Sequence, residues 1–130
     1  MKNDIEYNPI AGQPYSAFPV MHSSFVSFDG GVVAQGLLQR PDRYRFWSSG
    51  IVDVPLISRG AGLSYAAASF SEGGLAIEHS AFNRILDFDS EQNIVEVEAG
   101  IELSVLYDFL ASHGLYLPIQ PGHGRITVGI

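Results

Sequence analysis

Hydrophobic and polar residues alternate in short runs along most of the chain, a pattern that predicts strands rather than long helices. Apolar residues on both sides of the turn signal at residues 29–31 predict one hairpin. Residues 85–89 and 94–98 alternate around a polar connection and predict a second hairpin. Its solvated face is expected to carry Asp87, Asp89, Glu96 and Glu98. Two further strands are predicted at residues 54–58 and 75–77, each beside a pair of glycines.

One segment, residues 102–113, has the spacing of a helix. Leu103, Leu106 and Leu110 fall on one face of it, which predicts an amphipathic helix packed on a core. Gly114 follows where a helix often ends on a left-handed residue. Together with the strands, this helix predicts an α/β (α+β) fold, a small mixed or parallel sheet with flanking helices.

The first part of the chain carries weaker signals. Residues 1–24 are rich in Pro, Ser and aromatic residues without periodicity and are expected to form an irregular arm, which places the folded domain at residues 25–130. Pro41 can open a short helix over residues 42–49. A solvated face of that helix would then carry the local basic cluster Arg40, Arg43 and Arg45.

The composition fits one compact domain, because 46% of the 130 residues are hydrophobic and 16% are charged. A formal net charge of −7 argues against a nucleic-acid surface, which needs clustered lysine and arginine. The absence of cysteine excludes disulfides, thiolate metal sites and cysteine nucleophiles, and it agrees with a reducing compartment. No apolar run has the length of a membrane span and no secretory signal is apparent, so we expect a cytoplasmic protein.

The most specific chemistry in the chain lies at residues 59–65, Arg-Gly-Ala-Gly-Leu-Ser-Tyr, directly after a predicted strand. Gly60 and Gly62 are one residue apart, so backbone N–H groups can point into a common concavity that no side chain blocks. Such a loop can hold a phosphate or pyrophosphate with few charged side chains. The same pattern also occurs in plain glycine turns.

Other nucleotide and hydrolase motifs are not satisfied. A Rossmann motif requires a third glycine where Tyr65 stands, and Gly73 and Gly74 follow too early for a crossover helix. No Gly-Lys-Ser/Thr of a P-loop is present, and Ser64 is not within Gly-x-Ser-x-Gly. None of the four histidines has the spacing of a metal site; they are His22, His79, His113 and His123.

A second glycine-rich segment, residues 121–129, reads Pro-Gly-His-Gly-Arg-Ile-Thr-Val-Gly. It is either a second phosphate-type loop or a frayed tail, and His123 within it faces either a ligand or solvent. The side chain of Tyr65 likewise either bonds a ligand or packs over its own turn. Arg59 either compensates phosphate charge or pairs with a carboxylate such as Asp53.

Together these segments resemble the first half of a flavin domain of the vanillyl-alcohol oxidase and para-cresol methylhydroxylase superfamily. The resemblance covers residues 53–129. It rests on the order and spacing of Arg59 to Tyr65, Gly73-Gly74-Leu75-Ala76-Ile77, Ala99-Gly100, Pro121-Gly122 and Thr127-Val128-Gly129. The first and last of these are most similar to the branch of decaprenylphosphoryl-ribose 2-oxidase and related sugar oxidoreductases.

The resemblance implies that FAD lies between two small α/β subdomains and that a separate substrate domain covers the flavin. Residues 59–65 would hold the pyrophosphate, and residues 121–129 would line its other side. The implied cofactor-binding residues are Arg59, Gly60, Ala61, Gly62, Leu63, Ser64, Tyr65, Pro121, Gly122, His123, Ile126, Thr127 and Gly129. No catalytic and no metal-binding residue is implied within the chain.

Some members of the superfamily attach FAD covalently to a histidine directly after the second glycine of the first loop. Leu63 stands there, so the resemblance implies noncovalent FAD. It also implies a flavin-dependent oxidoreductase acting on the CH–OH group of a sugar-like or other alcohol substrate. Because the family pattern continues past Ile130, we expect a truncated piece that is inactive, or nearly so, when alone. The alternative is a non-catalytic remnant or small binding module without a cofactor.

Overall fold

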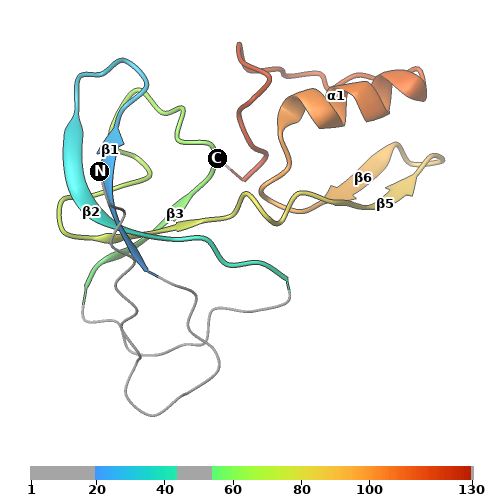
Figure 1. The fold of residues 1–130 in the computed structure, drawn as a ribbon. Helices are drawn as coiled ribbons and strands as arrows, with labels where there is room; N and C mark the ends of the chain where they lie inside the picture. The colour runs from blue at the N-terminus through green and yellow to red at the C-terminus, as the bar shows by residue number, and fades with distance from the viewer. Residues whose placement is uncertain (1–19, 44–53, 130) are drawn as a thin grey trace.

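The computed structural model describes residues 20–43 and 54–129, which form two lobes (Figure 1). The first, called here the sheet lobe, contains β1 (Met21–Val26), β2 (Val33–Gln39), β3 (Leu56–Arg59) and β4 (Leu75–Glu78). The second, called the helix lobe, contains β5 (Ile85–Asp89), β6 (Ile94–Val97), α1 (Leu103–Ser112) and the segment after α1. The chain passes from the first lobe to the second through residues 79–84.

The sheet lobe is built on a mixed sheet with the strand order β1-β2-β4-β3. β1 and β2 form an antiparallel hairpin, and β4 runs parallel to both β2 and β3. The hairpin turn is fixed by the carboxylate of Asp29, which accepts hydrogen bonds from Ser27 Oγ at 2.6 Å and from the Gly31 N–H at 3.0 Å. The connection from β3 to β4, residues 60–74, contains no helix and forms a long loop beside the sheet.

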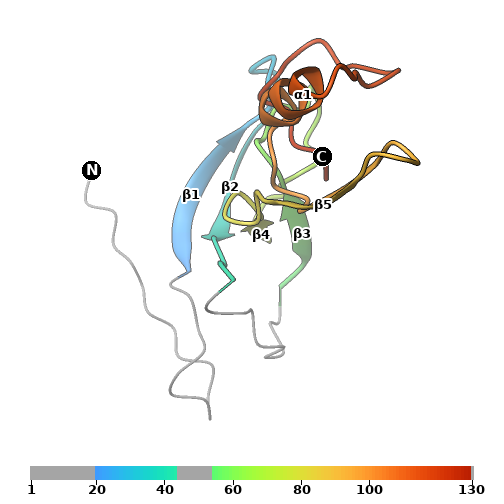
Figure 2. The same ribbon diagram turned by 90° about the vertical axis from the view of Figure 1, so that its right-hand side faces the viewer.

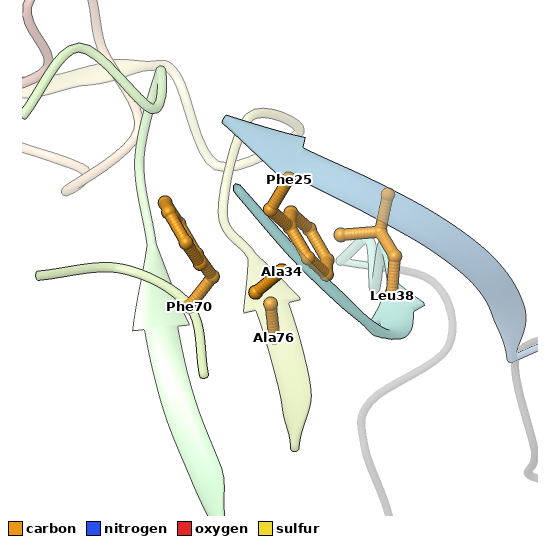
Figure 3. Packing of buried hydrophobic residues seen from close by; sticks show 5 residues of the cluster. All are labelled: Phe25, Ala34, Leu38, Phe70 and Ala76. Carbon is orange, nitrogen blue, oxygen red and sulfur yellow. The ribbon is translucent and has the colours of Figure 1, made fainter. Parts of the chain in front are cut away.

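One face of this sheet carries the first hydrophobic core (Figure 3). Alternation along the strands places Phe25, Ala34, Leu38 and Ala76 on the same side, and Phe70 joins them from the loop after β3. The rings of Phe25 and Phe70 stack with their centres 5.6 Å apart. Because Phe70 belongs to the long loop after β3, this stacking fixes the loop to the sheet.

The helix lobe has a separate core in which α1 packs on the antiparallel β5–β6 hairpin (Figure 2). The three leucines of the predicted stripe, Leu103, Leu106 and Leu110, are the buried residues of this core. After α1, Gly114 adopts a left-handed φ of +73°, and the Leu115 N–H donates to the Leu110 carbonyl at 2.9 Å. These bonds close the helix and turn the chain back toward the sheet lobe.

The structure confirms both predicted hairpins, the strands near residues 54–58 and 75–77, the helix and the mixed-sheet fold class. The one helix in the described part of the chain covers the β5–β6 hairpin and not the four-stranded sheet. The predicted arm is wrong at its end, because residues 21–24 belong to β1. Residues 1–19, and the helix predicted at 42–49 apart from its first two residues, lie outside the described residues.

Two side chains predicted to lie on solvated faces do not. The side chains of Arg43 and Glu98 form an ion pair between the lobes and are only 22% and 17% exposed. The predicted wet face of the second hairpin therefore loses Glu98. The solvated arginine cluster is likewise wrong for Arg43, while Arg45 lies outside the described residues.

Candidate functional site

A cleft with a volume of about 400 Å³ lies between the two lobes. Small-molecule sites usually have volumes of about 300–1,000 Å³. The sheet lobe supplies Gly60 and Ala61 from the loop after β3, and the helix lobe supplies Arg125 and Thr127 from the segment after α1. The other lining residues are Glu78, Ser80, Asn83, Gly100, Ile101, Glu102 and Val105. The two glycine-rich segments of the sequence therefore face one cleft.

Residues 59–65 are called here the first glycine loop. Glycine is required at position 62 of this loop for two reasons. Gly62 has a φ of +72°, which residues with a side chain rarely adopt, and a Cβ there would collide with the guanidinium of Arg59. Within the described residues, no group accepts a hydrogen bond from the N–H groups of residues 61–65. These N–H groups therefore have no partner in the described part of the chain, and among their residues Ala61 lines the cleft.

The side chain of Arg59 lies against Gly62 of the same loop and does not line the cleft. Its Nη1 donates to Ser69 Oγ at 2.9 Å, and its guanidinium carbon lies 5.1 Å from the centre of the Phe25 ring. Burial lowers the pKa of Arg59, and the nearby charge of Glu78 opposes that shift. Arg59 thus connects the loop to the core of the sheet lobe.

Residues 121–129 are called here the second glycine loop. The last four of them are hydrogen-bonded to the segment that leads into α1. Residues 126–129 run antiparallel to residues 99–103, with a bridge between Glu102 and Thr127. The bonds run from Leu103 N–H to the Ile126 carbonyl (2.9 Å), from Val128 N–H to the Ile101 carbonyl (3.0 Å) and from Gly129 N–H to the Ala99 carbonyl (2.8 Å). The frayed-tail alternative is therefore wrong for residues 126–129.

The N–H groups at the start of the second glycine loop are open as well. No acceptor in the described part of the chain faces the N–H groups of residues 122–124. His123 turns back on its own loop, where its Nδ1 accepts the Arg125 N–H at 3.1 Å. This contact requires Nδ1 to be unprotonated.

Phe28, in the turn between β1 and β2, joins the two glycine loops. Its N–H donates to the Ser64 carbonyl at 2.9 Å. Its ring meets Tyr65 edge-on at 5.3 Å and lies 6.2 Å from the His123 ring, measured between ring centres. Sequence reasoning missed Phe28, because nothing near it in the sequence indicates that the first hairpin reaches both loops.

The structure brings together part of the predicted set. Gly60, Ala61 and Thr127 line the cleft, and Tyr65 and His123 meet at Phe28. Ile126 packs against the core of the helix lobe. Like Tyr65, His123 and Ile126, the remaining predicted residues belong to the two loops without lining the cleft; they are Arg59, Gly62, Leu63, Ser64, Pro121, Gly122 and Gly129.

Three charged residues line the cleft but were not among the site residues predicted from the sequence; they are Glu78, Glu102 and Arg125. Glu78 Oε1 accepts hydrogen bonds from Arg40 Nε at 3.0 Å and from Ser80 Oγ at 2.8 Å. Glu102 lies 3.9 Å from the guanidinium of Arg125. Each carboxylate thus has a cationic neighbour, but both remain hydrogen-bond acceptors on the cleft wall.

This arrangement fits a ligand with an anionic centre and several hydroxyl groups. The open N–H groups of the two glycine loops suit a diphosphate, because backbone amide dipoles stabilise an anion without a large basic patch. Glu78 and Glu102 would repel a phosphate but accept hydrogen bonds from hydroxyl groups. A dinucleotide with a polyhydroxyl chain contains both kinds of group.

Comparison with protein families gives a match to the same part of the chain. A family model described as "FAD binding domain" matches residues 52–129. This range contains both glycine loops and ends at the last residue of the second.

Three relatives are similar to this chain over the same region. Decaprenylphosphoryl-beta-D-ribose oxidase of Mycolicibacterium smegmatis is 42% identical over 74 residues, which are 57% of this chain and 16% of the relative. An uncharacterized FAD-linked oxidoreductase of Mycobacterium tuberculosis is 32% identical over 77 residues (58% and 17%). D-lactate dehydrogenase of Anaerostipes hadrus is 35% identical over 78 residues (58% and 16%). The matched part of the chain thus spans about a sixth of each relative.

Proposed function

From the premise that the chain belongs to the FAD binding domain family, and so has FAD as its cofactor, we propose that it is the flavin-binding portion of a flavin-dependent oxidoreductase. The substrate would be a sugar-like or other alcohol, oxidised at a CH–OH group. Two relatives whose names state an oxidation of a hydroxyl compound, a ribose derivative and lactate, support this class of reaction. The observation that carries the proposal is the meeting of both glycine loops at one cleft.

The chain's part in such an enzyme is to bind and orient the cofactor. The N–H groups of residues 61–65 and 122–124 would hold the pyrophosphate from two sides. The cofactor-binding set proposed from the sequence is kept, with Arg59 lying against Gly62 of the first loop. Arg125, which is exposed at the cleft, would add a positive charge near the phosphates.

The acidic residues of the cleft would set the orientation of the bound cofactor. Glu78 and Glu102 exclude phosphate from their part of the wall, so the hydroxyl groups of the cofactor would lie there. When bound, FAD supplies the acceptor for a hydride from the substrate, and the protein supplies position and surroundings. The roles that we propose for the described residues of the cleft are binding and orientation, and none of them is a proton transfer.

The proposed location and partners rest on the sequence. Among the described residues, no helix has the length and apolar character needed to cross a membrane. The acidic, cysteine-free composition supports a cytoplasmic protein without a nucleic-acid partner.

Titration of the purified chain with FAD tests the function directly. Because the loops sit on opposite walls of one cleft, we expect saturable binding of one FAD per chain, seen as a change in flavin fluorescence. ADP, which carries the same diphosphate, should compete. A chain that leaves FAD fluorescence unchanged at millimolar concentration would be the small binding module without a cofactor.

The flavin is expected to be noncovalent, because Leu63 has no nucleophile where some family members carry a histidine. Acid precipitation of the chain loaded with FAD should leave all of the yellow colour in the supernatant. Colour that stays with the pellet after washing would refute this expectation.

A further inference from the structure

We propose that Arg43 and Glu98 form a clamp that holds the two lobes at the separation at which both glycine loops reach one FAD molecule. The role in FAD binding rests on the proposed function, whereas the joining of the lobes does not. Neither residue lines the cleft, so both would be positioning residues.

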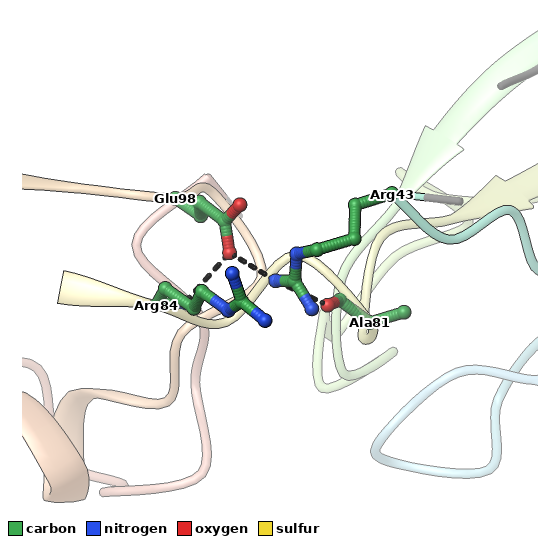
Figure 4. A network of polar contacts seen from close by, with 4 residues as sticks. All are labelled: Arg43, Ala81, Arg84 and Glu98. Atoms are coloured by element: carbon green, nitrogen blue, oxygen red, sulfur yellow. Dashed lines mark hydrogen bonds and ion pairs between the residues drawn. The ribbon is translucent and has the colours of Figure 1, made fainter. Parts of the chain in front are cut away.

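The clamp is a compact set of hydrogen bonds (Figure 4). Arg43 Nη2 donates to Glu98 Oε2 at 2.7 Å and to the Ala81 carbonyl at 3.0 Å. The same Oε2 accepts the Arg84 N–H at 2.7 Å. One guanidinium from the sheet lobe thus binds both the connection between the lobes and the residue that follows β6.

Few other contacts hold the lobes together in the described part of the chain. The buried cluster of the sheet lobe and that of the helix lobe share no residue. The connection is made by residues 79–84, where the Gly100 N–H donates to the Phe82 carbonyl at 2.7 Å and the Glu98 N–H donates to the Arg84 carbonyl at 2.8 Å. On the far side of the cleft, the Phe28 ring contacts His123. Without the Arg43–Glu98 pair, only these contacts among the described residues would oppose a rotation of one lobe against the other.

Each half of the clamp is connected through the backbone to one wall of the cleft. Glu98 precedes Ala99, whose carbonyl holds the Gly129 N–H of the second glycine loop at 2.8 Å. Arg43 follows β2, which pairs with β4; β4 pairs with β3, and β3 leads into the first glycine loop. A shift at the ion pair therefore changes the distance between the two loops.

The partial burial of this pair distinguishes it from an ordinary surface ion pair. The two carboxylates are sheltered alike, at 17% exposed for Glu98 and 16% for Glu78, but Arg43 is 22% exposed whereas Arg40 is 55% exposed. Exposed pairs contribute little because solvent screens them, while sheltered, charge-assisted hydrogen bonds are shorter and stronger. In addition, Arg40 and Glu78 belong to neighbouring segments of one sheet and join no lobes.

Spin labels can measure the lobe separation without FAD. The chain has no cysteine, so Ala67→Cys and Ala111→Cys place one label on an exposed position of each lobe. We expect a narrow distance distribution in the otherwise wild-type chain and a broad one after Arg43→Met. Arg43→Lys, which keeps the charge and part of the hydrogen bonding, should restore most of the narrow distribution.

Arg84→Met is the matched control. It removes a guanidinium that also lies beside Glu98, but it leaves the backbone N–H that donates to the carboxylate. Its distribution should equal that of the wild type. If Arg43→Met failed to fold, Glu98→Gln would replace it, since a neutral amide keeps the shape and loses the charge. An unchanged distribution in both Arg43→Met and Glu98→Gln would overturn the clamp.

FAD affinity is the second readout. Loss of one charge-assisted hydrogen bond between the lobes should weaken FAD binding about tenfold in Arg43→Met, with no change in Arg84→Met. If Arg43→Met broadened the distance distribution but bound FAD as the wild type does, the role in FAD binding would be refuted. If the wild type itself bound no FAD, the proposed function would fail and the clamp between the lobes would stand.

The pH dependence follows from the surroundings of Glu98. Burial raises the pKa of this carboxyl, but the Arg84 N–H, the hydrogen bond and charge of Arg43 and the charge of Arg84 outweigh burial and hold the pKa below its usual 4.5. The clamp is thus fully present above pH 4.5 and lost as the pH falls through the pKa of the folded chain. The distance distribution should broaden in that acid range in the wild type. In Glu98→Gln the distance distribution should not vary with pH over this range.

Discussion

Replacing Gly62 by alanine is expected to weaken FAD binding by at least about a hundredfold, the loss of one or two hydrogen bonds to a charged group. The φ of +72° disfavours any side chain, and the added Cβ would collide with the Arg59 guanidinium. Arg59 can move only by leaving Ser69 and the Phe25 ring. Either response displaces the N–H groups that would hold the pyrophosphate. Fluorescence titration with FAD measures the effect.

Gly73→Ala provides the matched control for backbone strain. Gly73 has a similar φ of +68°, and a Cβ there would have nothing within 4 Å. It lies in the turn before β4, outside the cleft lining. We expect a comparable loss of stability from strain but unchanged FAD affinity. Equal loss of affinity in both variants would show that general destabilisation, and not the first glycine loop, controls binding.

Replacing Gly100 by alanine is expected to lower the free energy of unfolding by about 3 kcal/mol or more, the upper range for overpacking. A Cβ at this position would collide with the His79 carbonyl oxygen and lie 2.6 Å from the Phe82 carbonyl oxygen. Both obstacles are backbone atoms, so no side chain can turn away to relieve the contact. The substitution would force apart the connection between the lobes. Chemical denaturation followed by circular dichroism measures the change.

Gly122→Ala is the control for this second prediction. A Cβ on Gly122 would have open space around it. The free energy of unfolding should be unchanged or rise by up to about 1 kcal/mol, because alanine reduces the freedom of the unfolded chain. If Gly100→Ala were as stable as Gly122→Ala, the close packing of residues 79–84 against Gly100 would be contradicted.

The elements of the fold were predictable where a short pattern decides the structure. The leucine spacing in α1 and the alternation in β5 and β6 are consequences of burying one face against a neighbour nearby in the sequence. The predicted irregular arm extended too far along the chain, because residues 21–24 pair with β2. Pairing with a partner strand is not visible in the composition of a single strand.

The candidate site was predictable only in its glycine loops. Gly60 and Gly62 indicate a loop by themselves, because a special backbone conformation limits the residue types that fit. The contact of Phe28 with His123 and the ion pair of Arg43 with Glu98 join residues distant in the sequence. Such pairs depend on how the lobes meet. Arg43 and Glu98 therefore resembled ordinary solvated charges.

Hydrogen exchange of the backbone amides, measured by NMR with and without FAD, tests the central claim most directly. In the free chain, the N–H groups of residues 61–65 and 122–124 should exchange rapidly, because they have no acceptor within the described residues. Addition of FAD should slow exchange in both loops together, with the same FAD concentration at half effect. Protection of one loop without the other, or of neither, would contradict the account.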